Sequence, residues 1–317
     1  MRKTIALLST FMIILCLTSC GTAQLREDAS AAVDTYNQAV AAYNTGIQPY
    51  NEAVGRIESA NEGLLSVVNA AQDVINQGET PYDPSTLEQL KAAMADAGEA
   101  KASVPPLLEE YEMLAVPEDA KKADLESLIE QATTGTESLS AVAIPDTPSV
   151  PDYSNVSAAV TDAQRTYEDS IQSLKQITAP EDSFVMERLQ RVDTITAMDA
   201  VTEDHDPNGQ LNKQGGYIGC IYFTDSQVDR SQLYLEEGED GIIDIGTDGG
   251  GAIEIFSTPE EAGVRENYLA SFDGMGMMAS GSHYIEGTCL IRTSNYLNGT
   301  QQKELTEKIA QALTAVD

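Results

Sequence analysis

The stretch Tyr36-Asn-Gln-Ala-Val-Ala-Ala-Tyr43-Asn-Thr-Gly-Ile-Gln-Pro-Tyr50-Asn51 repeats a Tyr-Asn pair every seven residues. Seven residues are two turns of an α-helix, so the pairs lie on one side of a helix. Apolar residues continue this spacing in steps of three and four, with Asn61 at the one polar seam position, which predicts a long helix whose heptad seam packs the tyrosines. The seam residues are Val33, Tyr36, Val40, Tyr43, Ile47, Tyr50, Val54, Ile57, Leu64, Val68, Ala71 and Ile75.

Two residues inside this helix predict a bend near its middle, because Gly46 is flexible and Pro49 lacks an N–H group. Three further amphipathic segments follow the long helix. They begin at Pro84-Ser85, at Pro117 and at about residue 153. We expect the first of them to carry its apolar face to Tyr111, with Pro105-Pro106 either kinking or splitting the helix.

Short breaks between amphipathic helices favour antiparallel neighbours, so residues 30–178 predict an all-α helical bundle or coiled-coil stalk. Pro145–Pro151 predicts a stiff, extended linker within it. The seam is too apolar to remain solvated, and it packs either within the chain or against a second copy as a homo-oligomer. The short breaks favour packing within the chain.

The character of the sequence changes after Ala179-Pro180, where glycine becomes frequent and period-two runs appear. We expect one amphipathic helix over 181–202, followed by alternating strands and helices. The strands are expected at 217–223, 252–256, 282–286 and 288–293, and the helices at 259–272 and 301–315. This order predicts a small α+β domain over 180–317 with an antiparallel sheet and helices on one face.

The first twenty residues combine a positive start at Arg2 and Lys3 with an apolar run that ends before Cys20. The run is too short to span a bilayer and is typical of a secretory signal. The residues that end at Cys20 resemble the bacterial lipobox, which implies a lipoprotein signal peptide over 1–19 and lipidation, such as palmitate, of Cys20. A tether over 20–29 is expected, and with it a lipid anchor on the extracytoplasmic face of the cell membrane.

Composition removes several classes of function. The net charge of −33 repels phosphate backbones, so we expect no nucleic-acid partner. The same charge disfavours adhesion to anionic headgroups, so the lipid must provide the anchor. Only two histidines occur, and no nucleophile–base pair or metal cluster is visible, so we expect no enzymatic activity.

Two motifs in the C-terminal half suggest specific sites. Asp204, Asp206 and Asn208 place oxygen ligands at alternate positions before a glycine, as calcium loops do, but the expected glutamate is replaced by Gly215. A structural turn is the alternative interpretation. Elsewhere, two cysteines fall in expected strands. They form a disulfide or remain two buried thiols, and they are Cys220 and Cys289.

Three other residues are candidates for ligand binding. Asp248 lies in a glycine-rich loop that precedes a strand, which argues against a phosphate site but suits the lip of a small-molecule groove. Arg265 and Arg292 stand out because cations are scarce in this chain. Each binds an anionic ligand or neutralises one of the many carboxylates. No cofactor other than a possible calcium ion is expected.

Four segments carry a resemblance that covers about residues 180–317. They are Val201–Tyr217, Gly246–Gly251, Tyr268–Gly274 and Arg292–Ser294. Together they resemble a C-terminal module of surface lipoproteins of Gram-positive bacteria, and the resemblance brings no known activity or functional residue. The sequence therefore predicts a non-enzymatic module that binds a ligand or an envelope protein on a helical stalk. The alternative is a structural spacer or assembly protein of the cell envelope.

Overall fold

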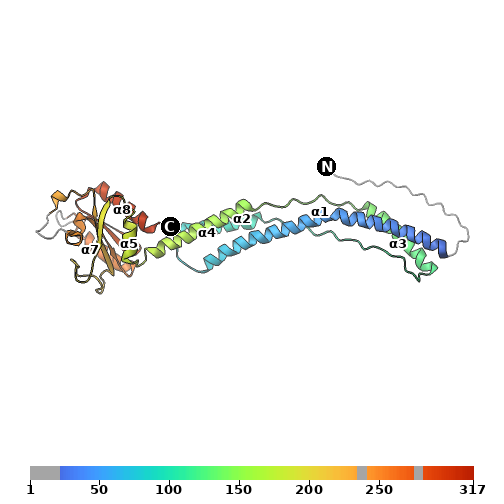
Figure 1. Ribbon diagram of the computed structural model, residues 1–317, viewed down its shortest axis with the longest axis horizontal. Coiled ribbons are helices and arrows are strands. Elements are labelled where there is room, and N and C mark those ends of the chain that lie inside the picture. Colours follow the sequence, from blue (N-terminus) through green and yellow to red (C-terminus); the bar gives the residue numbers. More distant parts are fainter. Residues whose placement is uncertain (1–21, 234–240, 275–280) are drawn as a thin grey trace. The chain divides into compact units, whose positions relative to one another are not determined.

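The computed structural model describes residues 22–233, 241–274 and 281–317 (Figure 1). Cys20 and the expected signal peptide lie outside these residues. The chain forms two compact units. The first comprises the chain up to Ala70 together with Met94–Ala159, and the second comprises Ala71–Ala93 together with Val160–Asp317. The boundary expected near residue 179 falls instead within helices, because the last part of the long first helix and most of a later helix pack with the sheet-bearing unit.

Helix α1 (Thr22–Asn76) is the longest helix of the first unit. It includes residues 22–29, which were expected to form a tether. It continues through Pro49. Gly46 makes room for a neighbour, because a Cβ at this position would lie 2.6 Å from Cδ1 of Ile144. The seam is covered by the chain itself. Its most buried members, all at most 4 % exposed, are Val33, Val40, Ile47, Val54, Ile57, Leu64 and Ala71.

The partners of α1 alternate between helical and extended conformation. Helices α2 (Ser85–Ala100), α3 (Lys122–Ala141) and α4 (Ser154–Gln176) are separated by extended segments, which run beside α1 in Figure 1. The expectation that the helix beginning at Ser85 reaches Tyr111 is wrong. Pro105 and Pro106 remove two N–H donors and clash with a preceding turn, so the chain leaves the helix before them. Residues 145–151, expected to be a linker, form neither helix nor strand.

Three asparagines of α1 hold the first extended segment through an asparagine ladder, which we define as Asn37, Asn44 and Asn51. Each side-chain amide donates to the carbonyl of one residue of the segment, and its oxygen accepts from the N–H of the same residue. The donor–acceptor distances all lie between 2.8 and 3.0 Å. The pairs are Asn37 with Leu114, Asn44 with Tyr111 and Asn51 with Leu108.

The spacing of the ladder follows from two helical geometries. Seven residues of an α-helix rise about 10.5 Å. Three residues of a polyproline-like chain span about 9 Å and complete one turn. The heptad of α1 therefore meets every third residue of the segment. The tyrosines of the repeat pack as expected, since the rings of Tyr43 and Tyr111 meet edge to face with centroids 5.1 Å apart.

The second unit contains a five-stranded antiparallel sheet with the strand order β1-β2-β3-β5-β4. The expected antiparallel α+β fold is confirmed. Its strands are β1 (Ile195–Ala200), β2 (Gly219–Asp225), β3 (Gly250–Ile255), β4 (Ser282–Glu286) and β5 (Cys289–Thr293). The single helix expected over 181–202 is wrong. Helix α5 (Asp182–Leu189) ends early, and the β-branched run Thr194-Ile195-Thr196 favours the strand that follows.

Helices cover both faces of the sheet, and not one face as expected. Helices α5 and α8 (Gly299–Thr314) pack on one face, and α6 (Ile242–Ile245) and α7 (Pro259–Ala270) pack on the other. Two 3₁₀ turns accompany them, η1 (Arg230–Gln232) and η2 (Gly246–Gly249). The reason is that β2, β3 and β5 are buried along their whole length and require cover on both sides.

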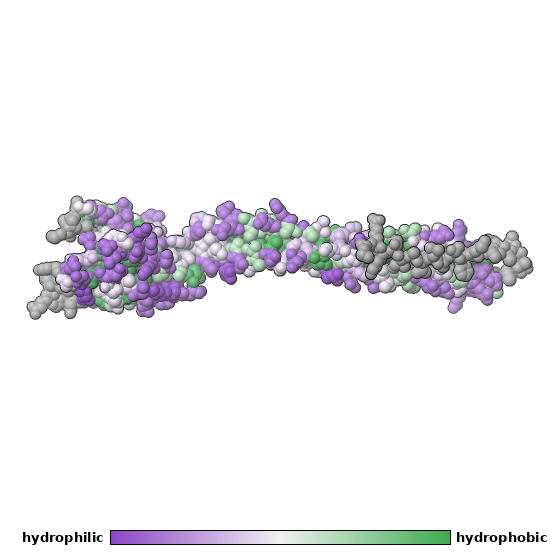
Figure 2. All heavy atoms as spheres, turned by 90° about the horizontal axis from the view of Figure 1, so that it is seen from above, coloured by the Kyte–Doolittle hydropathy of each residue, from purple (hydrophilic) through white to green (hydrophobic). Residues whose placement is uncertain are grey.

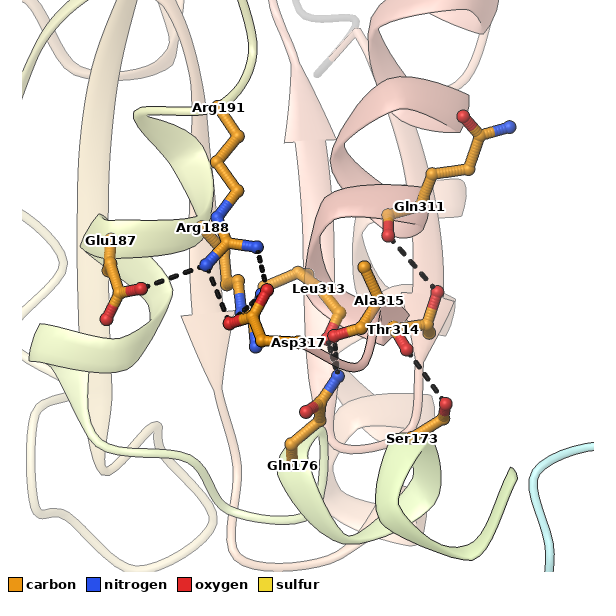
Figure 3. Close-up of polar contacts among 10 residues, drawn as sticks. All are labelled: Ser173, Gln176, Glu187, Arg188, Arg191, Gln311, Leu313, Thr314, Ala315 and Asp317. Carbon is orange, nitrogen blue, oxygen red and sulfur yellow. Dashed lines mark hydrogen bonds and ion pairs between the residues drawn. The ribbon is translucent and has the colours of Figure 1, made fainter. Parts of the chain in front are cut away.

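The end of α8 is held by side chains from α4 and α5 (Figure 3). Gln176 donates to the carbonyls of Leu313 at 2.8 Å and Ala315 at 2.7 Å, and Ser173 donates to the carbonyl of Thr314 at 2.8 Å. These carbonyls have no partner within a helix that ends here. Asp317 pairs with both Arg188 and Arg191, which hold its pKa well below the usual range.

The ladder predicts an unusual pattern of hydrogen exchange. The amides of Leu108, Tyr111 and Leu114 should exchange slowly in an otherwise extended segment, because each is bonded to an asparagine. Asn51→Ala should abolish the protection of Leu108 and destabilise the first unit by about 1–2 kcal/mol, for two lost hydrogen bonds. Hydrogen exchange followed by NMR, together with thermal unfolding, checks both effects.

The matched control is Asn69→Ala, which alters an exposed asparagine of the same helix. Alanine favours helix more than asparagine does, so this variant should keep or gain stability. Equal unfolding temperatures for the two variants would show that the ladder contributes no stability.

Candidate functional site

A groove with a volume of about 500 Å³ lies between the edge strand β4 and helix α8. Tyr82, in the loop before α2, borders it. All of its lining residues belong to the second unit. Figure 2 shows hydrophilic residues over much of the visible surface of the sheet-bearing end, on the left. Clefts of this size hold small ligands or a few residues of a peptide.

Helix α8 forms one wall because its sequence has two different faces. Asn298 and Gln301 form a capping box that fixes the start of the helix. Leu305, Ile309 and Leu313 recur at intervals of four and are buried against the sheet. A neighbouring stripe of mostly polar residues lines the groove, from Gly299 through Lys303 and Glu307 to Thr314.

Strand β4 forms the other wall, and its side chains alternate between the two faces of the sheet. Tyr284 and Glu286 line the groove. The imidazole of His283 lies toward α7, where Nδ1 is 3.2 Å from Oε1 of Glu266 and Nε2 is 3.4 Å from Oδ2 of Asp273. The strand position is fixed by the Gly287-Thr288 turn, whose Thr288 N–H donates to the carbonyl of Ile177 at 2.9 Å.

The most unusual group in the groove is the carboxylate of Glu286. The residue is only 5 % exposed, and none of the cations in the described part of the chain forms an ion pair with it. Burial raises its pKa, although a hydrogen bond from Tyr82 acts in the opposite direction. Burial and the neighbouring Glu286 raise the pKa of Tyr82 to about 12. The groove therefore contains a carboxylate that lacks a counter-ion.

Two of the residues singled out in the sequence, Arg265 and Arg292, meet at a different carboxylate. Glu254 on β3 is fully buried. Arg265 donates to both of its oxygens, at 2.7 and 2.9 Å, and Arg292 donates to one at 2.7 Å. Burial alone would raise the pKa of Glu254, but the two guanidinium groups outweigh it and lower the pKa. Both cations thus neutralise a carboxylate of the protein, which was the alternative to ligand binding.

Asp248, the third binding candidate, lies in η2. Its backbone carbonyl accepts a hydrogen bond of 2.7 Å from Ser294. Burial raises the pKa of its side chain, and nearby Arg292 moderates the rise. It does not line the groove. Sequence analysis missed Glu254, Glu286 and Tyr82; the one signal for Glu254 is a lone acid in the apolar strand Ala252–Phe256.

The calcium-like motif is organised as a turn. The carboxylate of Asp206 accepts from the N–H groups of Asn208, Gln210 and Leu211 and from the hydroxyl of Tyr217. The side chain of Asn208 donates to the hydroxyl of Tyr222 at 3.0 Å. No cluster of three or more His, Cys, Asp or Glu side chains in residues 22–233, 241–274 and 281–317 is placed to hold a metal ion. The oxygens proposed as ligands, those of Asp204, Asp206 and Asn208, are not assembled into a calcium site.

The expected disulfide is not formed. Cys220 and Cys289 are both free and buried. Cys220 belongs to the core under α7, and Cys289 belongs to the core under α8. The two thiols face opposite sides of the sheet, and β3 lies between their strands. They are two buried thiols that fill core space, which was the alternative interpretation.

Comparison with known proteins does not assign the chain to a family. No protein-family model matches the chain, no curated protein matches it, and no solved structure matches it. Among the described helices, none has both the length and the apolar character needed to cross a bilayer.

The groove carboxylate predicts a pH-dependent stability. Burial raises the pKa of Glu286 above its value in the unfolded chain. The native state therefore loses stability as the pH rises from the pKa of the unfolded chain to that of the folded chain, and the full penalty is present above the folded-state pKa. Glu286→Gln removes the penalty. The variant should therefore unfold at a higher temperature than wild type at about pH 7, and this gain should shrink at about pH 4.

Glu304→Gln provides the control, because Glu304 is exposed on α8, the helix that forms the other wall, and does not itself line the groove. It should shift the unfolding temperature little at either pH. A gain for Glu286→Gln that is the same at both pH values would contradict a raised pKa.

Proposed function

We propose that this chain is a lipid-anchored envelope protein on the extracytoplasmic face of the cell membrane, whose α+β module binds a partner without catalysis. The observation that carries the proposal is the groove between β4 and α8, which combines an open sheet edge, two exposed tyrosines and a buried carboxylate. Tyr82 is 43 % exposed and Tyr284 is 48 % exposed. Tyrosine of this kind is enriched at protein interfaces.

The chemistry of the groove favours binding over catalysis. Its ionisable groups are acids, tyrosines, His283 and Lys303, whose Nζ lies 3.8 Å from Oε1 of Glu307. The imidazole of His283 is directed toward carboxylates on the α7 side. The described lining thus lacks the pairing of nucleophile and base that covalent or general-base catalysis uses.

The anchor rests on the resemblance of the segment ending at Cys20 to a lipobox. Bacterial lipoproteins of this kind carry two or more acyl chains, which is sufficient for stable attachment. The charge of −33 gives the protein no electrostatic affinity for anionic lipid, so attachment depends on the acyl chains alone.

Replacing the anchor residue tests this part of the proposal. Cys20→Ala should yield an uncleaved precursor or a protein shed into the medium, because no thiol remains to accept lipid. Membrane fractionation and mass spectrometry of the N-terminus measure both results. Cys16→Ala, within the segment expected to be removed, is the matched control and should be retained. A Cys20→Ala variant that is processed and retained like wild type would exclude lipid anchoring.

Site-specific crosslinking tests the groove. A benzoylphenylalanine in place of Tyr284 should give a discrete covalent adduct in intact cells on irradiation. The same group in place of Tyr268, which is 55 % exposed on α7, should not give that adduct. The adduct at position 284 should disappear when Tyr82→Ala is added, because Tyr82 lines the same groove. Equal adducts at positions 284 and 268, or none at either, would argue against the groove as the binding site.

A further inference from the structure

The main chain of β4 carries hydrogen-bonding groups at the edge of the sheet that have no partner in the part of the chain that the structure describes. Glu286 and Cys289 flank the two-residue Gly287-Thr288 turn, and opposed residues in an antiparallel pair alternate between bonded and non-bonded pairs. Tyr284 therefore bonds to β5 together with Glu286. The N–H and C=O groups of His283 and Ile285 point to the free edge, where no other strand among the described residues lies.

The two edges of the sheet differ. β1, the opposite edge, has an irregular register between Ile195 and Ala197, and such bulges discourage pairing with a further strand. β4 pairs in unbroken register from Ser282 to Glu286 and contains no proline or lysine, which are the residues that commonly protect an edge. β4 is therefore the edge that remains able to accept another strand.

The groove beside β4 is long enough for a strand. Its α8 wall runs from Gly299 to Thr314, a rise of about 22 Å. This length corresponds to about six or seven residues of extended chain. An extended peptide paired with β4 would therefore place a few of its residues in the groove, whose volume is about 500 Å³.

Charge specifies the occupant further. Glu286 lies in the groove, is 5 % exposed and has no cationic partner among the described residues. A carboxylate in such a position is stabilised by a charge-assisted hydrogen bond from a lysine or arginine. The net charge of −33 also attracts a basic partner over a longer range.

We infer that the occupant of the groove is an extended, basic segment of a partner protein, which adds to β4 as a sixth strand and places a lysine or arginine beside Glu286. The inference rests on the proposed function and names the class of partner for the same site. Main-chain bonds to His283 and Ile285 supply affinity that is independent of sequence, and the cation at Glu286 supplies selectivity. The exposed ring of Tyr284 covers an apolar side chain of the added strand.

The test uses the full chain and a defined probe, an eight-residue peptide that alternates lysine and valine. The peptide should bind saturably, and it should slow hydrogen exchange at the amides of His283 and Ile285 but not at Tyr284, which is already bonded to β5. Two matched peptides serve as controls. One carries glutamate in place of lysine, and the other carries N-methyl groups on alternate residues, which block strand pairing. Both should bind at least about tenfold more weakly.

Variants of the protein separate charge from pairing. Glu286→Gln should weaken binding of the lysine peptide by about tenfold, for a lost charged hydrogen bond, whereas Glu304→Gln should leave it nearly unchanged. Binding by Glu286→Gln that equals wild type would overturn the role of the carboxylate. Unchanged exchange at His283 and Ile285, undiminished binding of the N-methylated peptide, or no saturable binding up to about 1 mM would overturn strand addition.

These failures are distinguishable from failure of the proposed function. Crosslinking at position 284 makes no assumption about the conformation or the charge of the partner. A specific adduct in cells, combined with failure of the lysine peptide, would overturn the basic strand and leave the binding module in place.

Discussion

The structure depends on one requirement, that main-chain N–H and C=O groups find partners when a segment is neither helix nor strand. The segment after α2 contains Pro105 and Pro106 and cannot bond to itself. The asparagine ladder of α1 supplies the missing partners at every third residue. Among the described residues, the same requirement is unmet at β4, where no further strand pairs with the edge of the sheet. In the first unit, an extended segment whose main-chain groups are hydrogen-bonded packs along α1. In the second unit, an edge strand with main-chain groups that are free among the described residues borders the candidate site.

Two buried carboxylates of the second unit differ in whether the protein itself supplies their counter-ions. Glu254 is surrounded by Arg265 and Arg292, and this cluster is complete within the protein. Removing either arginine would leave Glu254 with one guanidinium group and fewer hydrogen bonds in the core, so the cluster holds α7 and β5 against β3. Glu286 is almost as buried, but the hydroxyl of Tyr82 is the only hydrogen-bond partner of its side chain among the described residues. A carboxylate of this kind costs stability in the isolated protein, and a cationic ligand would offset that cost.

Much of the fold could be predicted from periodicity. The seam of α1, strands β2 to β5 and helices α7 and α8 were all predicted near their true positions, because each has a clear period of 3.6 or 2. The prediction of a helix over 190–202 was wrong, because Val192, Ile195 and Met198 fit a helical period while the β-branched residues of this segment favour a strand. The sequence could not decide whether Cys220 and Cys289 are bridged, because the register of the strands decides which face of the sheet each side chain occupies. The groove was invisible in the sequence, since Tyr82 and Glu286 are brought together only by the fold.

The heptad of Tyr-Asn pairs was visible, but its role was not, because an asparagine that bonds to a main chain needs a partner that the sequence does not announce. The regular spacing of the asparagine ladder ends after Asn51. Asn61 follows Asn51 by ten residues, about 15 Å of helix, while Ala102 and Leu108 are separated by about 19 Å of extended chain. The lengths no longer match, and Asn61 keeps one bond to Ala102, from its amide to the carbonyl at 2.9 Å. The hydroxyl of Tyr153 restores the other, since it donates to Asn61 and accepts from the N–H of Ala102, each at 2.7 Å. Where the two periods diverge, a side chain from the second extended segment completes the hydrogen bonding, and this ties both extended segments to the same helix.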